Sequence, residues 1–190
     1  TGSCKQYRRP QKGGQVIMQP TFTSSRILQP VRPWFVYFSL ICALLLNLLP
    51  TAYWPGVPDW VALVLCFWAI REPRRVGMGW AFALGLAMDV ADGSVLGQHG
   101  FAYVLTAYLA AAQSRRILWF PLGKQALQIL PMLLACQALQ LLMRLLAGDD
   151  YPGWGFMVGP LVAALLWFPL TFLLLLPQYQ PVERDENRPL

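Results

Sequence analysis

Residues 60–77 read WVALVLCFWAIREPRRVG, an apolar run that is followed at once by a basic segment. The run from Trp60 to Ile70 is apolar on all sides, so a helix formed from it needs lipid or other helices around it. Over the chain, 56% of residues are hydrophobic and 13% are charged, which is too apolar for an ordinary soluble domain of 190 residues. The sequence therefore predicts a polytopic membrane protein.

Similar apolar runs lie on both sides of this segment, separated by short polar stretches. The second and third runs are short for a spanning helix, which usually needs about 20 residues, so they require help from flanking Pro, Trp and Arg residues or a thin bilayer. We still count both and expect an all-α bundle of six transmembrane helices. The expected spans are 34–49, 60–70, 76–91, 95–112, 125–147 and 154–176.

The basic residues alternate along the chain in a way that predicts membrane topology. The loops near residues 55, 95 and 150 contain no Lys or Arg, whereas the N-terminal segment and the loops near 73 and 118 contain several. Cytoplasmic loops of membrane proteins are enriched in these residues, so we expect both termini in the cytoplasm. The same alternation explains the net charge of +6 without nucleic-acid binding. The residues are Lys5, Arg8, Arg9, Lys12, Arg26, Arg32, Arg71, Arg74, Arg75, Arg115, Arg116 and Lys124.

The domain organisation follows from these patterns. We expect a flexible, basic cytoplasmic segment at 1–33, a transmembrane domain at 34–177 and a cytoplasmic tail at 178–190. No signal peptide is apparent before the first span. Residues 1–17 resemble untranslated sequence, which leaves Thr1 and Met18 as alternative starts.

Cysteine and histidine usage excludes the common metal and disulfide patterns. The cysteines have no CxxC spacing, and three of them lie in apolar runs, where a thiol behaves as a small apolar group. His99 is the single histidine, which excludes a site with several histidine ligands. We expect no cofactor and no metal. The cysteines are Cys4, Cys42, Cys66 and Cys136.

Two ionisable residues fall inside expected spans, where charge is costly and is a functional candidate by default. Asp89 and Arg144 both lie close to the outer ends of outward-running helices, so an ion pair between them is one possibility, with Asn47 joining it. The alternative is that Arg144 extends to the headgroups and Asp89 caps a loop. Gln137, Gln140 and Arg144 share one helix face, which we expect to point into the bundle.

The polar stretch 89–99 connects the third and fourth expected spans. Asp92, Ser94 and His99 could be imagined as a catalytic triad, but Gly93 and Gly97 favour a simple turn. We interpret His99 as a surface loop residue and Asp92 as a turn former that bonds its own backbone.

The third expected span is rich in small residues, which allow close approach between membrane helices. We therefore expect this helix to be the central scaffold of the bundle. The residues are Gly77, Gly79, Ala81, Ala83, Gly85 and Ala87.

A series of short motifs in this region resembles the rod shape-determining protein MreD family. Each motif is weak by itself, but their order within a chain of six expected spans is specific. The likeness covers about the last 160 residues, most clearly the second to fourth spans. The motifs are Pro58-Asp59-Trp60, Phe67-Trp68, Pro73-Arg74-Arg75-Val76-Gly77, Gly85-Leu86-Ala87-Met88-Asp89 and Gly93-Ser94-Val95-Leu96-Gly97.

The resemblance implies a non-enzymatic scaffold of the bacterial cell-elongation machinery in the inner membrane. Its implied partners are MreC, the MreB filament, the glycosyltransferase and transpeptidase of lateral-wall peptidoglycan synthesis, and membrane lipid. It also implies a fold similar to the substrate-binding membrane subunits of energy-coupling-factor vitamin transporters. The candidate contacts for partners are Arg71, Pro73, Arg74 and Arg75 on the inside and the 89–99 turn on the outside.

Two other functions remain open at this point. A small-molecule binder of the vitamin-transporter type would use the 89–99 turn and the face with Gln137, Gln140 and Arg144 as an outward pocket. An enzyme acting on lipid-linked precursors is the weakest alternative, because no convincing acid and base pair is visible.

Overall fold

The computed structural model describes residues 32–49, 56–151 and 153–178, and this part of the chain is helical without strands. The expectations for the basic N-terminal segment and for the C-terminal tail fall almost entirely outside the described residues. The helices are α1 (Pro33–Asn47), α2 (Trp60–Arg71), α3 (Met78–Asp92), α4 (Gln98–Leu118), α5 (Leu122–Leu146) and α6 (Gly159–Leu175), with the short 3-10 helices η1 (Trp154–Val158) and η2 (Leu176–Gln178).

Each expected span corresponds to one helix, but α4 is longer than expected. Its last turn includes Arg115 and Arg116, which the sequence analysis placed in a loop. Cations are favourable at a helix C-terminus, because the unpaired carbonyl groups there carry partial negative charge. Lys124 was also expected in this loop, but it lies in the first turn of α5. The connection between α4 and α5 is therefore shorter than expected.

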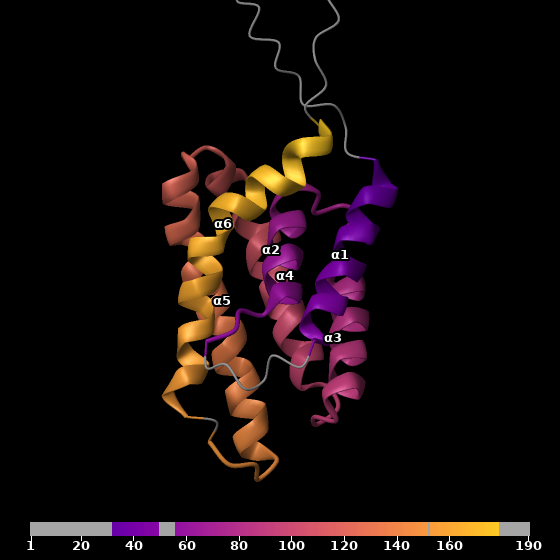
Figure 1. Cartoon of the computed structure of the whole chain (residues 1–190), viewed down its shortest axis with the longest axis vertical. Coiled ribbons are helices and arrows are strands. Elements are labelled where there is room, and N and C mark those ends of the chain that lie inside the picture. Colours follow the sequence, from indigo (N-terminus) through magenta and orange to yellow (C-terminus); the bar gives the residue numbers. More distant parts are fainter. Residues whose placement is uncertain (1–31, 50–55, 152, 179–190) are drawn as a thin grey trace, which may run out of the picture.

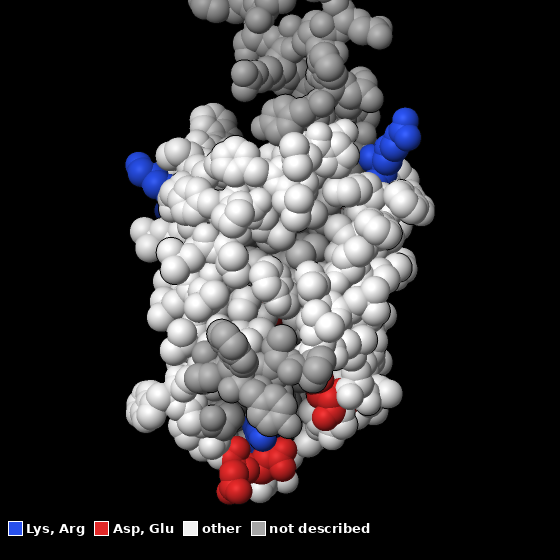
Figure 2. All heavy atoms as spheres, viewed as in Figure 1, with Lys and Arg blue, Asp and Glu red and all other residues white. Residues whose placement is uncertain are grey.

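The helices run up and down, so their connections alternate between two ends of the bundle (Figure 1). The start of α1, the α2–α3 and α4–α5 connections and the end of α6 lie at the upper end in this view. The α3–α4 turn and the α5–η1 connection lie at the lower end. Figure 2 shows Lys and Arg near the upper end of this face and Asp and Glu near the lower end, where one basic group lies among the acids. We call the upper end in this view the basic end of the bundle and the lower end the acidic end.

The central helix is α2, and not α3 as predicted. Every residue from Val61 to Ile70 is buried, and α2 packs against α1, α4, α5 and α6. By contrast, α3 packs mainly on α4 and leaves Trp80, Phe82 and Val90 exposed. The physical reason is that α2 is apolar all round, and such a helix gains most when neighbours surround it.

The small residues of α3 still serve close packing at one point. A side chain added at Gly85 would place its Cβ 2.4 Å from the Cα of Gly100 in α4, so the two backbones meet there directly. The predicted role of small residues in close approach is therefore confirmed at Gly85, although the helix lies at the edge of the bundle. The aromatic rings of Tyr37 and Trp80, 4.9 Å apart, connect α1 to α3.

Among the residues that the structure describes, two segments are long and apolar enough to cross a bilayer by length and composition, namely Leu122–Leu146 and Trp154–Leu175. The helices Pro33–Asn47 and Trp60–Arg71 are apolar but shorter. Large apolar side chains are exposed on α1, α3, α4, α5 and α6, including Ile41, Leu127 and Leu165, whereas α2 between them is enclosed. A surface of this kind suits lipid or a partner protein better than water.

Candidate functional site at the acidic end of the bundle

The carboxylate of Asp89 lies at the centre of the α3–α4 turn and is only 1% exposed. Its Oδ1 accepts hydrogen bonds from the backbone N–H of His99 at 2.8 Å and from the hydroxyl of Ser94 at 3.1 Å. Its Oδ2 accepts from the backbone N–H of Gly97 at 2.7 Å and, more weakly, from that of Gly100 at 3.4 Å. The side chain of Asp89 therefore accepts hydrogen bonds from residues along the whole α3–α4 turn and holds this turn in place.

This carboxylate takes the place of a local N-cap for α4. Gly97 occupies the N-cap position with φ of 100°, and it has no side chain that could accept from the first N–H groups of the helix. The first turn of a helix presents unpaired donors and partial positive charge, which a carboxylate satisfies. Gly93 ends α3 in the left-handed conformation, with φ of 64°. The predicted glycine turn is thus confirmed, and so is the alternative in which Asp89 caps a loop.

His99 is not the surface loop residue that we predicted. It lies in the first turn of α4, and its side chain is 14% exposed. Its Nδ1 lies 2.9 Å from Oδ1 of Asp89, and its Nε2 lies 4.0 Å from Oδ2 of Asp92. Asp92 is the last residue of α3 and faces the histidine, instead of capping its own turn. Since Ser94 bonds Asp89, the three triad residues do not form the relay that a triad needs.

The predicted pair between Asp89 and Arg144 is wrong. The Nε of Arg144 lies 3.9 Å from Oδ2 of Asp149, just beyond the end of α5, and the arginine side chain is 38% exposed. The α3–α4 turn already occupies both oxygens of Asp89. A long arginine side chain can reach the end of its own helix more easily than a neighbouring helix, and its extension to the headgroups stays a prediction.

A second cluster, the Asp59 cluster, was missed by the sequence analysis. The carboxylate of Asp59 accepts from the hydroxyl of Tyr103 in α4 at 2.8 Å and from the amide of Asn47 in α1 at 2.9 Å. It also accepts from the amide of Gln140 in α5 at 3.3 Å and from the backbone N–H of Ala62 in α2 at 3.0 Å. One carboxylate therefore connects four helices.

One signal for this cluster was present in the sequence. An aspartate directly before an apolar run is typical of a helix N-cap, and Asp59 precedes Trp60 in this way. Asn47 was singled out, but its partners are Asp59 and the backbone N–H of Trp60, and not Asp89 or Arg144. Tyr103 is fully buried in α4 and gave no polar signal, because tyrosine is common in apolar helices.

The glutamine face of α5 points into the bundle, as predicted. Gln140 is 5% exposed and reaches Asp59. Gln137 donates from Nε2 to the carbonyl oxygen of Phe156 in η1 at 2.6 Å, which connects α5 to the chain entering α6. Arg144, one turn further on, lies at the rim.

The four residues predicted as partner contacts on the inside lie at the basic end, whereas the 89–99 turn lies at the acidic end. The guanidinium of Arg71 lies over the ring of Phe67 at 5.1 Å, and Arg75 lies 3.6 Å from Glu72. Pro73 and Arg74 are exposed in the α2–α3 connection. In the described part of the chain, no group of three or more His, Cys, Asp or Glu residues is arranged to hold a metal ion.

The family model described as rod shape-determining protein MreD matches residues 25–176. The chain belongs to this family. The MreD protein of Haemophilus influenzae is 30% identical over 148 residues, which cover 75% of this chain and 89% of that protein. No solved structure matches the chain.

The MreD match includes both polar clusters of the acidic end. Asp59, Asp89 and Gln140 lie within the matched residues, as does the basic connection between α2 and α3. Membership of the MreD family, together with the apolar helices, identifies the chain as a membrane protein with a role in rod shape. The predicted likeness to energy-coupling-factor transporter subunits stays a prediction.

Proposed function

We propose that the protein is a non-enzymatic membrane scaffold that helps to position or activate the synthases of lateral-wall peptidoglycan. In this proposal it acts with MreC, the MreB filament and the glycosyltransferase and transpeptidase of cell elongation. The MreD family match over residues 25–176 is the observation that carries the proposal. The relative from Haemophilus influenzae, described as a rod shape-determining protein, supports it.

The hydrogen bonds at the acidic end agree with a structural task for its polar residues. Asp59 binds four helices together, and Asp89 holds the α3–α4 turn. A general acid, a general base or a nucleophile has to face a substrate, whereas these carboxylates face donors of their own chain. Rigid helices with exposed apolar faces are what a scaffold within a membrane requires.

We further propose that all six helices span the inner membrane of a bacterium, with both termini in the cytoplasm. The separation of a basic and an acidic end along the bundle supports this orientation (Figure 2). The shorter helices α1 and α2 would then lie in a bilayer that is locally thin or is bridged by flanking aromatic and basic side chains.

Reporter fusions test this orientation. Reporters inserted after Arg74 or after Arg116 are expected to be active only in the cytoplasm, because these positions lie at the basic end. The proposed orientation gives the same expectation for fusions to either terminus. A reporter at Asp150 is expected to be active only outside the inner membrane. A cytoplasmic signal at Asp150, or an external one at Arg74, would refute the orientation.

Depletion of the protein in its host tests the function. Rod-shaped cells are expected to become round while the uptake of vitamins stays normal. Loss of uptake of one vitamin at normal cell shape would instead support the small-molecule binder. The cleft near Asp59 has a free volume of about 10 Å³, which is room for one water molecule at most, so the small-molecule binder would need α5 and α6 to separate.

The exposed partner contacts allow a sharper version of this experiment. The double variant Pro73→Ala with Arg74→Ala changes surface residues of the α2–α3 connection, so we expect normal protein levels together with round cells. Arg116→Ala removes an exposed cation at the same end and is the matched control, with rod shape retained. Rod shape in both variants would remove this surface from the proposal.

A further inference from the structure

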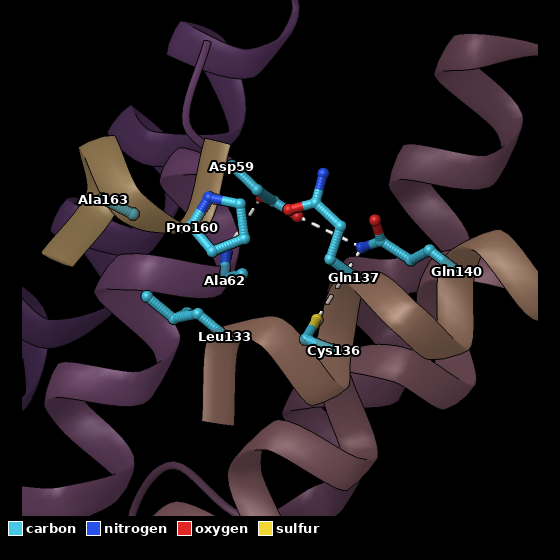
Figure 3. A pocket seen from close by; sticks show the side chains of 8 residues that line it. All are labelled: Asp59, Ala62, Leu133, Cys136, Gln137, Gln140, Pro160 and Ala163. Atoms are coloured by element: carbon cyan, nitrogen blue, oxygen red, sulfur yellow. Dashed lines mark hydrogen bonds between the residues drawn. The ribbon is translucent and has the colours of Figure 1, made fainter. Parts of the chain in front are cut away.

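A small cleft opens beside the Asp59 cluster, between the start of α2, the middle of α5 and the start of α6 (Figure 3). The amide of Gln137 has a defined orientation there, because its nitrogen donates to the carbonyl oxygen of Phe156. Its oxygen Oε1 therefore points the other way, and Figure 3 shows it directed toward the carboxylate of Asp59. The cleft is lined by Asp59, Ala62, Leu133, Cys136, Gln137, Gln140, Pro160 and Ala163.

Oxygen atoms also converge on Gly159, at the start of α6. A Cβ added to this glycine would lie 3.2 Å from the carbonyl oxygen of Val57 and 3.4 Å from Oε1 of Gln137. Both atoms are hydrogen-bond acceptors, and neither can donate to the other. The absence of a side chain at Gly159 leaves room between these two acceptors, of which Gln137 also lines the cleft beside Asp59.

Asp59 adds a negative charge beside the amide oxygen of Gln137. Its side-chain donors are the neutral groups of Asn47, Tyr103 and Gln140, and none of the ion pairs within the described residues includes it. A carboxylate that is partly removed from water and lacks an opposite charge is costly. A cation placed among these oxygens would offset that cost.

We propose that this cleft binds one small monovalent cation of the size of sodium, held by the carboxylate of Asp59 and by Oε1 of Gln137. Carboxylate and amide oxygens are hard ligands that suit such ions. A single carboxylate matches a single positive charge. The free space of about 10 Å³ suits one particle of the size of a water molecule.

Thermal unfolding of the purified full-length chain in detergent tests this site. The midpoint is measured in increasing sodium chloride, with choline chloride added to keep the ionic strength constant. We expect the midpoint to rise with sodium and to saturate, because a ligand that binds only the folded state stabilises it. A midpoint that does not respond to sodium would overturn the proposal and leave water as the occupant of the cleft.

Two variants place the effect in the cleft. Gly159→Ala fills the space between the oxygens, and Gln137→Met removes one oxygen at similar volume, so each is expected to raise the half-saturating sodium concentration about tenfold or more. Gly79→Ala is the matched control, since a Cβ there meets nothing within 4 Å, and its sodium response should equal that of the wild type. An unchanged response in both cleft variants would overturn the proposal.

Discussion

Replacing Asp59 by alanine is expected to lower the free energy of unfolding by about 3 to 5 kcal/mol. The variant loses the N-cap of α2, and it leaves the hydroxyl of Tyr103 and the amides of Asn47 and Gln140 without their acceptor. A buried donor without a partner costs more than the hydrogen bond itself contributed. Because four helices meet at this carboxylate, the loss extends over most of the bundle.

Equilibrium unfolding in detergent measures the effect, with Asp150→Ala as the control. Asp150 is exposed at the same end of the bundle, and its replacement should change stability by less than about 0.5 kcal/mol. Tyr103→Phe removes one donor only, so it should cost about 1 kcal/mol in the wild type and much less when Asp59 is already alanine. If Tyr103→Phe lowers the free energy of unfolding equally in the wild type and in Asp59→Ala, the hydrogen bond between Tyr103 and Asp59 does not contribute to stability.

Replacing Asp89 by alanine is expected to cost about 2 to 4 kcal/mol and to loosen the α3–α4 turn. The variant removes the acceptor of the N–H groups of Gly97, His99 and Gly100 and that of the hydroxyl of Ser94. The start of α4 then has no side-chain cap, because Gly97 supplies none. Hydrogen exchange of the amides from 97 to 100 should therefore become faster than in the wild type, and it should accelerate more than that of the middle of α4.

Asp92→Ala is the matched control for this prediction, since Asp92 lies in the same turn of α3 but is largely solvent-exposed, with 43% of its side chain accessible. Its Oδ2 is 4.0 Å from the ring of His99, so its removal should leave the exchange of those amides close to that of the wild type. If the two variants accelerate exchange equally, the cap is not the role of Asp89. If Asp89→Ala retains full stability, the turn is held by other contacts.

The variants Asp59→Ala and Asp89→Ala also test the role of the protein in rod shape. In a scaffold, loss of the Asp59 or Asp89 contacts acts through stability, so round cells should appear together with reduced protein levels. The double variant Pro73→Ala with Arg74→Ala changes exposed residues, so it is expected to give round cells at normal protein levels. This difference distinguishes residues that hold the bundle together from residues that contact a partner.

Much of the architecture could be predicted without coordinates, because the relevant signals are local. The six apolar runs correspond to the six α-helices, and Gly93 and Gly97 form the predicted turn. The helix ends were less certain, as Arg115 and Arg116 show, since the polar end of a helix resembles a loop in sequence. The small residues of α3 indicated close packing, but they could not indicate whether the helix lies at the centre or at the edge.

The apolar runs and the cations at alternate loops were enough to predict a helical membrane protein, and the motifs indicated the MreD family. The partners of the polar groups could be found only from the packing of the helices, since Asp59 contacts Tyr103 and Gln140, which lie 44 and 81 positions away. The period of a helix indicates which residues share a face, but it carries no information about the neighbouring helix that this face meets. For that reason Asp89 and Arg144, predicted as a pair from matched depth, bind a turn and a helix end instead.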